Sequence, residues 1–301
     1  MCLIITKETK VIVQGGTGKQ GSYHVKAMKE YGTNVVAGVT PGKGGTNVEG
    51  VPIFDTVKEA MDKYKIDASL IMVPGPFVLD AAKEAIDVGV ALIIIVTEHI
   101  PVHDTMKIKA FAQMKGCTLV GPNTIGIINC QEKVKIGIMP GFLYGTGNIG
   151  LISRSGTLSH ETASNLMYKG IGLSTVVGIG GDQIIGTDFV DALKIFKDDR
   201  ATEAVVMLGE IGGNREEKAA EYLQSCDYGK PVFCFIAGRN APPGKKMGHA
   251  GAIIQGDAGT VQSKEEKLQI AGVQVATSLE NLVEKVVSFQ ECAKEASCNQ
   301  E

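Results

Sequence analysis

Short apolar runs alternate with amphipathic stretches along the first half of the chain. The apolar runs cover residues 10–15, 33–39, 67–73, 91–96 and 117–121, and the stretches between them place apolar residues at helical spacing. Strands that are apolar at nearly every position are typical of parallel sheets covered by helices on both faces. The pattern therefore predicts a doubly wound α/β domain in which strands and helices alternate.

A second set of alternating runs occupies the second half of the chain. A glycine-containing segment, residues 131–147, separates the two sets and is interpreted as a linker. The predicted domains are therefore residues 1–130 and residues 148–301. Ligands of doubly wound sheets bind at the carboxyl ends of strands, so the loops that follow strands are the places to look for a site. The strands predicted for the second domain are 148–153, 174–179, 203–209, 231–238 and 272–278.

The composition is that of an ordinary globular protein and argues against two classes. Hydrophobic residues make up 44% of the 301 residues, and the net charge of −3 does not support nucleic-acid binding. The longest apolar run, Val88–Val96, is much shorter than the ~18 residues that a membrane span needs. The seven cysteines form no CxxC pair, which favours a reducing compartment. We expect a cytoplasmic protein, with an organelle matrix as the alternative.

The loop after the first predicted strand has the sequence GGTGKQG, in which Gly16, Gly18 and Gly21 match the pattern GxGxxG. Glycines let a ligand approach the backbone closely, and the N-terminus of the following helix offers N–H groups to a phosphate. The same glycines also permit close packing of a helix on a strand without any ligand. The loop is interpreted as a phosphate site, with the packing role as the alternative.

The end of the second predicted strand distinguishes between nucleotide ligands. An NAD site has an acidic residue there, whereas this chain has Lys43. A cation suits a ligand that carries a phosphate on its ribose, and both coenzyme A and NADP meet that description. Neither GVTPGKGG nor GRNAPPGKK is a complete triphosphate-binding loop. A nucleoside triphosphate, if one is used, is therefore expected to bind another chain.

Three loops of the second half also follow predicted strands. Ser155, Gly156 and Thr157 lie at the start of a helical stretch, Glu210 comes directly after a strand, and His249 stands in the turn GHAGA. The carboxyl ends of parallel strands lie at one edge of the sheet, so these loops are expected to converge. A carboxylate beside an imidazole fixes its tautomer and raises the basicity of the other ring nitrogen.

Four interpretations of His249 are open from the residues alone. A metal site is not expected, because neither His103 nor His160 has a metal-like spacing from it. A serine hydrolase is disfavoured, because the chain has no GxSxG elbow. Phosphorylation of the ring is favoured, because its glycine neighbours leave room for the group and a helix N-terminus can bind it. The remaining alternative is an ordinary surface residue beside a basic patch.

Six motifs together resemble one family. GGTGKQG, GVTPGKGG, SRSGTL, VGIGGD, GEIGG and MGHAGAII, in this order, are similar to the α subunit of succinyl-CoA synthetase (succinate–CoA ligase, NDP-forming), from about residue 5 to residue 287. The resemblance implies a Rossmann-like CoA-binding domain followed by a flavodoxin-like ligase domain. It also implies an enzyme that joins succinate to CoA, with NTP converted to NDP and phosphate.

The resemblance assigns roles to residues of this chain. His249 would be the phosphorylated nucleophile, Glu210 its hydrogen-bonding partner, and Ser155, Gly156 and Thr157 the helix start that holds the phosphoryl group. The residues implied in CoA binding are Thr17, Gly18, Lys19, Gln20, Lys43, Val96, Thr97 and Glu98. The resemblance further implies a β subunit with an ATP-grasp fold that binds ATP or GTP with Mg²⁺, in an αβ or α2β2 assembly.

Two departures from the family pattern leave the carboxylate open. His160 replaces a tyrosine that the resemblance associates with the substrate, and Thr124 with Ile125 replaces a more usual Cys-Pro or Thr-Pro pair. Succinate is the default, while malate, citrate and sulfoacetate are alternatives. An NADP-dependent oxidoreductase is the alternative from another class, although it gives GHAGA and GEIGG no role.

Overall fold

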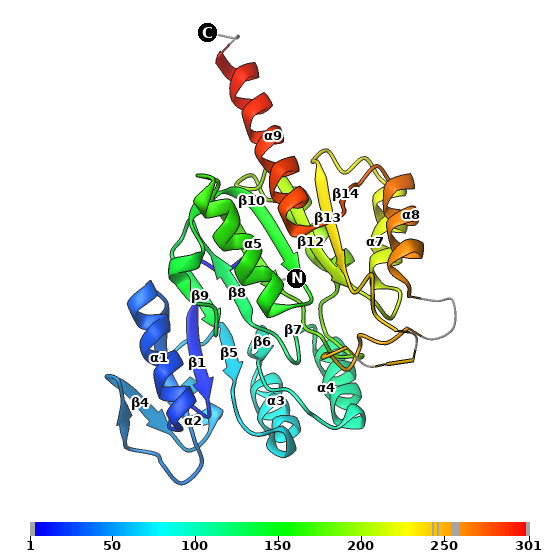
Figure 1. Ribbon diagram of the computed structural model, residues 1–301. Helices are drawn as coiled ribbons and strands as arrows, with labels where there is room; N and C mark the ends of the chain where they lie inside the picture. The colour runs from blue at the N-terminus through cyan, green and yellow to red at the C-terminus, as the bar shows by residue number, and fades with distance from the viewer. Residues whose placement is uncertain (1–3, 243, 246, 255–258, 299–301) are drawn as a thin grey trace. The chain divides into compact units, whose positions relative to one another are not determined.

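The structure, a computed structural model, describes residues 4–242, 244–245, 247–254 and 259–298. The chain is an α/β protein that divides into two compact units (Figure 1). The first unit consists of Met1–Gly141 and Val177–Thr187, and the second of Phe142–Val176 and Asp188–Glu301. The α/β fold class expected from the sequence is confirmed, whereas the exact domain boundaries given above stay a prediction.

A largely parallel sheet forms the centre of the first unit. Its order is β3-β4-β2-β1-β5-β6-β7, in which β3–β4 is antiparallel and the other pairs are parallel. From β4 to β7 this is the strand order of a Rossmann fold, with the topological switch point between β1 and β5. The strands are β1 (Lys10–Gln14), β2 (Asn34–Val39), β3 (Asn47–Val48), β4 (Val51–Phe54), β5 (Ala68–Ile71), β6 (Leu92–Ile95) and β7 (Thr118–Val120).

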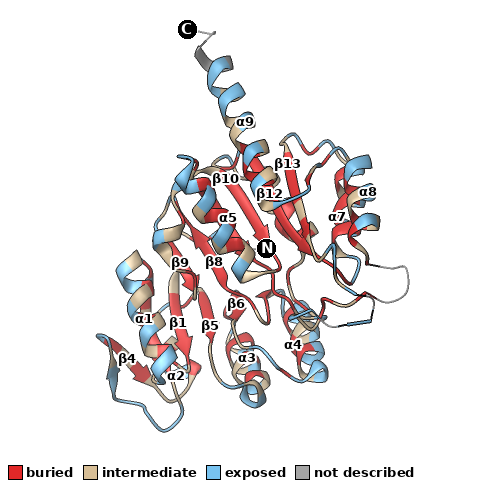
Figure 2. Ribbon diagram, viewed as in Figure 1, coloured by how far each residue is buried: buried red, intermediate tan, exposed pale blue. Residues whose placement is uncertain are grey.

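Helices connect these strands, and the α-helices among them bury apolar residues against the sheet. Every residue of β5 and β6 is buried, as expected for strands covered on both faces (Figure 2). The core joins apolar residues of these strands, such as Ile71 and Ile93, to helix residues such as Ala82 and Ile108. The helices are α1 (Lys19–Tyr31), α2 (Val57–Met61), η1 (Gly75–Phe77), α3 (Val78–Asp87) and α4 (Val102–Lys115).

The segment interpreted as a linker carries regular structure. Strand β9 (Val134–Gly137) pairs antiparallel with β8 (Gly126–Asn129), and the short helix η2 (Gly141–Leu143) follows. Gly137, inside this segment, allows the two strands to pack closely, because a Cβ there would lie 2.2 Å from the carbonyl oxygen of Ile125. The segment is therefore partly regular in structure, whereas its role as the connection between two domains stays a prediction.

The second unit is built on strands in the order β14-β13-β12-β10-β11, in which the pairs from β14 to β10 are parallel. This is the order of a flavodoxin-like sheet, with its switch point between β10 and β12. The strands are β10 (Thr146–Ser153), β11 (Leu173–Gly178), β12 (Ala204–Glu210), β13 (Val232–Ala237) and β14 (Gln274–Ala276). The helices are α5 (Gly156–Tyr168), α6 (Phe189–Asp198), α7 (Arg215–Gln224), α8 (Val261–Ile270) and α9 (Leu279–Cys298). Within the described ranges, no helix is long and apolar enough to cross a membrane.

Helix α1 packs closely on the loop before it at Gly21, and a substitution there tests this packing. An ideal Cβ on Gly21 would lie 2.3 Å from the carbonyl oxygen of Gly15, whereas a Cβ on Gly16 would meet nothing nearer than 3.5 Å. We expect Gly21→Ala to reduce the free energy of unfolding by about 1–3 kcal/mol, because backbone must move to admit the methyl group. Gly16→Ala is the matched control and should change it far less. Equal unfolding curves for the two variants in urea would contradict this account of the loop.

Candidate active site

Two strand-end loops of the first unit are joined by a threonine pair. The hydroxyl oxygens of Thr17, after β1, and Thr40, after β2, lie 3.2 Å apart. The backbone N–H of Lys43 donates to the carbonyl oxygen of Thr40, so the loop that carries the lysine is anchored to the same point. The side chain of Lys43 is exposed. Thr17 and Lys43, both expected to bind CoA, therefore lie in connected loops.

The start of α1 suits an anion. Gly18 is the N-cap and has no side chain to occupy the first N–H groups, while Lys19 and Gln20 open the helix. No acidic residue lies in the first turn. The positive end of the helix dipole and the Lys19 ammonium thus act in the same direction on a phosphate.

The residues after β6 belong to the same edge of the sheet. The hydroxyl of Thr97 donates to the carbonyl oxygen of Val73, after β5, at 2.7 Å, and Val96 N–H donates to Ile71. Glu98 is exposed and lies 3.7 Å from His99 Nε2. The predicted CoA-binding residues therefore come from loops at the carboxyl ends of β1, β2 and β6.

Sequence reasoning missed an acidic group beside the Lys43 loop. Asp55 follows β4, and its carboxylate accepts a hydrogen bond of 2.8 Å from the backbone N–H of Gly44. Asp55 is too far along the chain from β2 to match the acidic position of an NAD site, so no motif pointed to it. Its contact with the backbone shows that it shapes the loop on which Lys43 stands.

In the second unit, the helix after β10 begins at the predicted anion site. Ser155 is the N-cap of α5, and its hydroxyl accepts from the backbone N–H of Leu158 at 3.4 Å. The hydroxyl of Ser153 donates to the carbonyl oxygen of Ser155 and accepts from its N–H, which fixes the turn. Gly156 and Thr157 are the first two residues of the helix, so the predicted trio lies at its positive end.

His249 and Glu210 form a hydrogen bond. The distance from His249 Nδ1 to Glu210 Oε2 is 2.8 Å, and the glutamate ends β12 with 9% of its side chain exposed. A carboxylate accepts hydrogen bonds, so a neutral ring in this contact carries its hydrogen on Nδ1 and its lone pair on Nε2. About a quarter of the His249 side chain, 27%, is exposed. A ring held in this way is arranged to react through Nε2.

Glycines bring the histidine turn to the end of β12. Gly212 has φ of +83°, and a Cβ there would lie 2.2 Å from the carbonyl oxygen of Gly251. The N–H of Met247 donates to Ala252, and the N–H of Ala252 donates to His249, which closes the turn around the imidazole. The GEIGG and GHAGA motifs therefore fit together because neither has a side chain at the point of contact.

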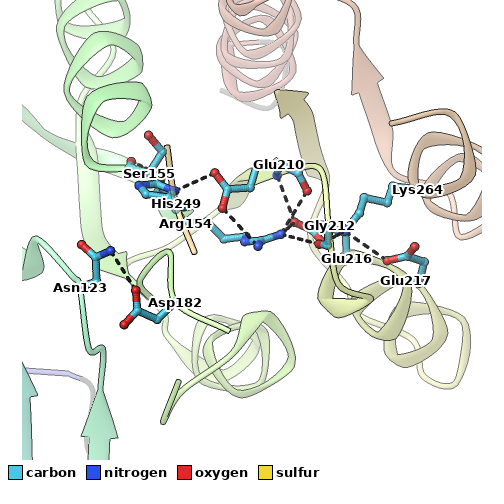
Figure 3. A network of polar contacts seen from close by, with 11 residues as sticks. Asn123, Arg154, Ser155, Asp182, Glu210, Gly212, Glu216, Glu217, His249 and Lys264 are labelled. Atoms are coloured by element: carbon cyan, nitrogen blue, oxygen red, sulfur yellow. Dashed lines mark hydrogen bonds and ion pairs between the residues drawn. The ribbon is translucent and has the colours of Figure 1, made fainter. Parts of the chain in front are cut away.

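A row of buried charges continues from Glu210 (Figure 3). Arg154 Nη2 lies 3.2 Å from Glu210 Oε1, and Arg154 Nη1 lies 2.9 Å from Glu216 Oε1. Lys264 pairs with Glu216 on its other side and lies 3.4 Å from Glu217. Three of these side chains, Arg154, Glu216 and Lys264, are at most 1% exposed.

Sequence reasoning missed this cluster. Arg154 stands inside the SRSG motif, and Glu216 with Glu217 lies in the first turn of α7, where charges usually belong to a solvated surface. Burial raises the pKa of Glu216, but Arg154 and Lys264 outweigh it and hold that pKa at about 2. Burial alone lowers the pKa of Arg154, yet Glu216 and Glu210 raise it above its ordinary value.

His160 is held by a buried tyrosine. The hydroxyl of Tyr144 lies 2.5 Å from His160 Nδ1 and 3.2 Å from the hydroxyl of Ser159. Burial lowers the pKa of His160, so a neutral imidazole stands at the position of the expected phenol. The second departure has a structural role, because the buried Thr124 hydroxyl accepts from Gly126 N–H at 3.0 Å and donates to Gly178.

Two family models match the chain: a CoA binding domain over residues 6–99 and a CoA-ligase over residues 152–274. The chain is 52% identical to succinate–CoA ligase [ADP-forming] subunit alpha 2 of Archaeoglobus fulgidus, over 96% of this chain and all of the relative. The chain belongs to the succinate–CoA ligase alpha-subunit family. The Staphylococcus aureus member is 50% identical over 98% of this chain and 96% of its own length. The family resemblance expected from the motifs is confirmed.

Solved structures agree on the fold. ATP citrate lyase from Methanothrix soehngenii, in complex with citrate and coenzyme A, matches 98% of this chain with a TM-score of 0.87 at 21% identity. Acetyl-coenzyme A synthetase 1 from Ca. Korarchaeum cryptofilum matches 92% with a TM-score of 0.77, also at 21% identity. The chain spans 51% and 59% of these two proteins, respectively. At this identity the likeness shows a shared fold.

The buried charges predict a specific response to acid. The pKa of Glu216 lies at about 2 instead of its ordinary 4.5, so its ionisation stabilises the folded state above about pH 4.5 and this contribution is lost as the pH falls through 2. We expect Glu216→Gln to reduce the free energy of unfolding at neutral pH by about 3–5 kcal/mol, because Arg154 and Lys264 lose their partner.

The same variant should weaken the dependence of stability on pH between about 4.5 and 2, because one titrating group is gone. Urea unfolding at a series of pH values measures both effects. Glu221→Gln, an exposed carboxylate on the same helix α7, is the matched control and should behave as the wild type. Unchanged stability and an unchanged acid slope in Glu216→Gln would mean that Arg154 and Lys264 do not depend on Glu216 to compensate their charges.

Proposed function

We propose that this chain is the alpha subunit of an ADP-forming succinate–CoA ligase and that His249 carries a phosphoryl group between nucleotide and succinate. The relatives named as such alpha subunits match nearly the whole chain at 50–52% identity. The observation that carries the histidine role is the 2.8 Å contact from Glu210 Oε2 to His249 Nδ1. That contact directs the ring's lone pair to Nε2.

Coenzyme A would bind the first unit. The CoA binding family model covers this part of the chain, and the loops after β1, β2 and β6 supply groups suited to an anion. The start of α1 at Gly18 would take the pyrophosphate, as helix N-termini do. The exposed Lys43 would take the phosphate on the ribose, which also explains the absence of an acidic residue at that position.

His249 would act as a covalent carrier. Its Nε2 attacks the terminal phosphorus of the nucleotide, and the P–O bond to the leaving diphosphate breaks. The ring then bears a positive charge that the Glu210 carboxylate stabilises through Nδ1–H. The start of α5, at Ser155, Gly156 and Thr157, would hold the oxygens of the phosphoryl group at the positive end of the helix.

The second half of the reaction returns the histidine to its starting state. A carboxylate oxygen of succinate attacks the phosphorus and the P–N bond breaks, which leaves succinyl phosphate and a neutral His249. The thiolate of coenzyme A then attacks the acyl carbon, and phosphate leaves as the thioester forms. Dividing one difficult condensation into two easier transfers is the general advantage of covalent catalysis.

A partner subunit would hold the nucleotide. The sequence has no complete triphosphate-binding loop, and the relatives are named as alpha subunits. We infer a β subunit with an ATP-grasp fold that binds ATP or GTP with Mg²⁺ and assembles with this chain as αβ or α2β2. This chain's own contribution at that step is the placed imidazole and the α5 N-terminus.

His160 is proposed to contact the carboxylate substrate. Its neutral ring is held by Tyr144 through Nδ1, so the other ring nitrogen offers a hydrogen bond rather than a charge. A neutral donor in place of a phenol keeps the type of contact that a small carboxylate needs. This supports succinate as the default substrate, with malate, citrate and sulfoacetate as outcomes of the same assay.

Replacing His249 tests the carrier role directly. The wild-type chain, co-expressed with its partner subunit and given Mg²⁺ and γ-³²P-labelled ATP, should incorporate acid-labile phosphate. His249→Asn should incorporate none, because asparagine has no nucleophilic ring nitrogen. His103→Asn, an exposed histidine of α4, is the control and should label like the wild type. Label that persists in His249→Asn would place the phosphoryl group elsewhere.

A second measurement on the same variant distinguishes the loss of the carrier from a folding defect. His249→Asn should bind coenzyme A with unchanged affinity in calorimetry, because the proposed CoA-binding residues lie in the first unit. Loss of both labelling and CoA binding would indicate a folding defect, and labelling should then be repeated with His249→Gln. Adding succinate and coenzyme A to the labelled wild type should discharge the label, and discharge by another carboxylate alone would identify a different substrate.

A further inference from the structure

Arg154 makes contacts that reach across the end of β12. Its Nη1 donates to the carbonyl oxygens of Glu210 and Gly212, each at 3.1 Å, and to Glu216 Oε1 at 2.9 Å. Its Nη2 lies 3.2 Å from Glu210 Oε1. One guanidinium thus contacts both the backbone and the carboxylate of the residue that binds His249 (Figure 3).

The two oxygens of Glu210 are divided between two partners. Oε2 accepts from His249, while Oε1 faces the charge of Arg154. Among the described residues, Oε1 is buried without a hydrogen bond of good geometry, so the nearby guanidinium is the group that compensates its charge. Only 9% of the Glu210 side chain is exposed, which leaves little water to take the place of Arg154.

Arg154 is itself held rigidly. Glu216 Oε1 contacts Arg154 and also accepts from the backbone N–H of Glu210 at 3.1 Å. Lys264 contacts Glu216 in turn, and its ammonium donates to the carbonyl oxygen of Gly212 at 3.1 Å. Charges of opposite sign therefore alternate from Glu210 to Glu217. Because Arg154 and Glu216 are fully buried, neither side chain can turn away without leaving a charge uncompensated.

We infer that Arg154 is a positioning residue for the phosphoryl transfer: it orients the carboxylate of Glu210 and thereby fixes His249 in the Nδ1–H tautomer that reacts through Nε2. The inference rests on the proposed function of His249. Arg154 acts through Glu210, since the contacts given above are with Glu210, Gly212 and Glu216.

The chemistry of the side chain explains why arginine is needed. A guanidinium is planar and has five N–H donors in a fixed fork, so it can hold two carboxylates and two carbonyl oxygens together. A lysine at position 154 has the same charge but a single nitrogen at the end of a flexible chain. It would keep the charge of the cluster and lose the orientation of Glu210.

Glu210→Gln gives the sharpest test because it leaves Arg154 in place. Arg154 has donors only, so it should take the amide oxygen of the glutamine, and the amide nitrogen should then face His249. That nitrogen donates, so it requires an unprotonated Nδ1. The tautomer of His249 should change from Nδ1–H to Nε2–H.

The tautomer is read from the ¹⁵N shifts of the two ring nitrogens in the full chain, with ¹⁵N-labelled histidine. The chain has five histidines, and comparison with His249→Asn assigns the signal of His249. Persistence of Nδ1–H in Glu210→Gln would overturn the inference, because it would mean that Arg154 does not orient residue 210. A structural role of Arg154 alone would not move this signal.

Arg154→Lys tests the same inference from the other side. The variant should show a mixture of both His249 tautomers. In the co-expressed assembly its rate of phosphorylation should fall about 10- to 100-fold, the range found for residues that orient histidines in metal sites. Arg200→Lys, an exposed arginine, is the matched control and should change neither reading. A folded Arg154→Lys with wild-type tautomer and rate would also overturn the inference.

The two proposals fail in different ways. If the wild type takes up no label, the function proposed for His249 is wrong, whatever the tautomer. If the wild type is labelled and the tautomer of Glu210→Gln does not change, the carrier role stands and the positioning role of Arg154 is wrong. Should Arg154→Lys fail to fold, the result with Glu210→Gln decides.

Discussion

The arrangement of the second unit depends on one buried carboxylate, that of Glu210, which contacts both an arginine and a histidine. Glu210 cannot be buried at the end of β12 unless its charge is compensated, and Arg154 supplies that compensation from the loop after β10. The same guanidinium needs Glu216, and Glu216 needs Lys264. Four elements, the ends of β10 and β12 and the helices α7 and α8, are therefore tied together by the requirement that no charge be left unpaired.

Such a cluster adds no more to the free energy of unfolding than apolar residues of similar shape would, but it fixes the positions of its side chains. Removing two charges from water costs about as much as their attraction returns, so apolar residues of similar shape would hold the elements together as well. What apolar residues would not provide is a carboxylate oxygen fixed 2.8 Å from an imidazole nitrogen. The arrangement makes sense if the orientation of that oxygen matters, as it does for a nucleophilic ring.

Both units have the same feature that suits an anion, a helix N-terminus beside the switch point of the sheet. In each unit, a helix that follows a strand beside the switch point begins after a small N-cap residue. In the first unit this is Gly18 before α1, and in the second it is Ser155 before α5. Neither helix has an acidic residue in its first turn, so no negative side chain offsets the positive end of the helix dipole.

The sequence predicted the regular elements of both sheets well, because strands such as β5 and β6 are buried at every position and are almost entirely apolar. It did not predict the hairpin of β8 and β9, in which Gly137 allows two strands to pack closely. It also missed Arg154 and Glu216, since a charged residue gives no sign in the sequence that it will be buried. Burial lowers the pKa of His160, and the ring is held by Tyr144, sixteen residues earlier, which no motif connects to it.

The most direct test of this account is to find which ring nitrogen of His249 bears the phosphorus. Long-range correlation of ³¹P with the ring protons, recorded on the phosphorylated assembly, distinguishes the two isomers. Because Glu210 holds Nδ1, the account predicts phosphorus on Nε2. Phosphorus on Nδ1 would contradict it, since that atom could not then donate to the carboxylate that the buried arginine orients.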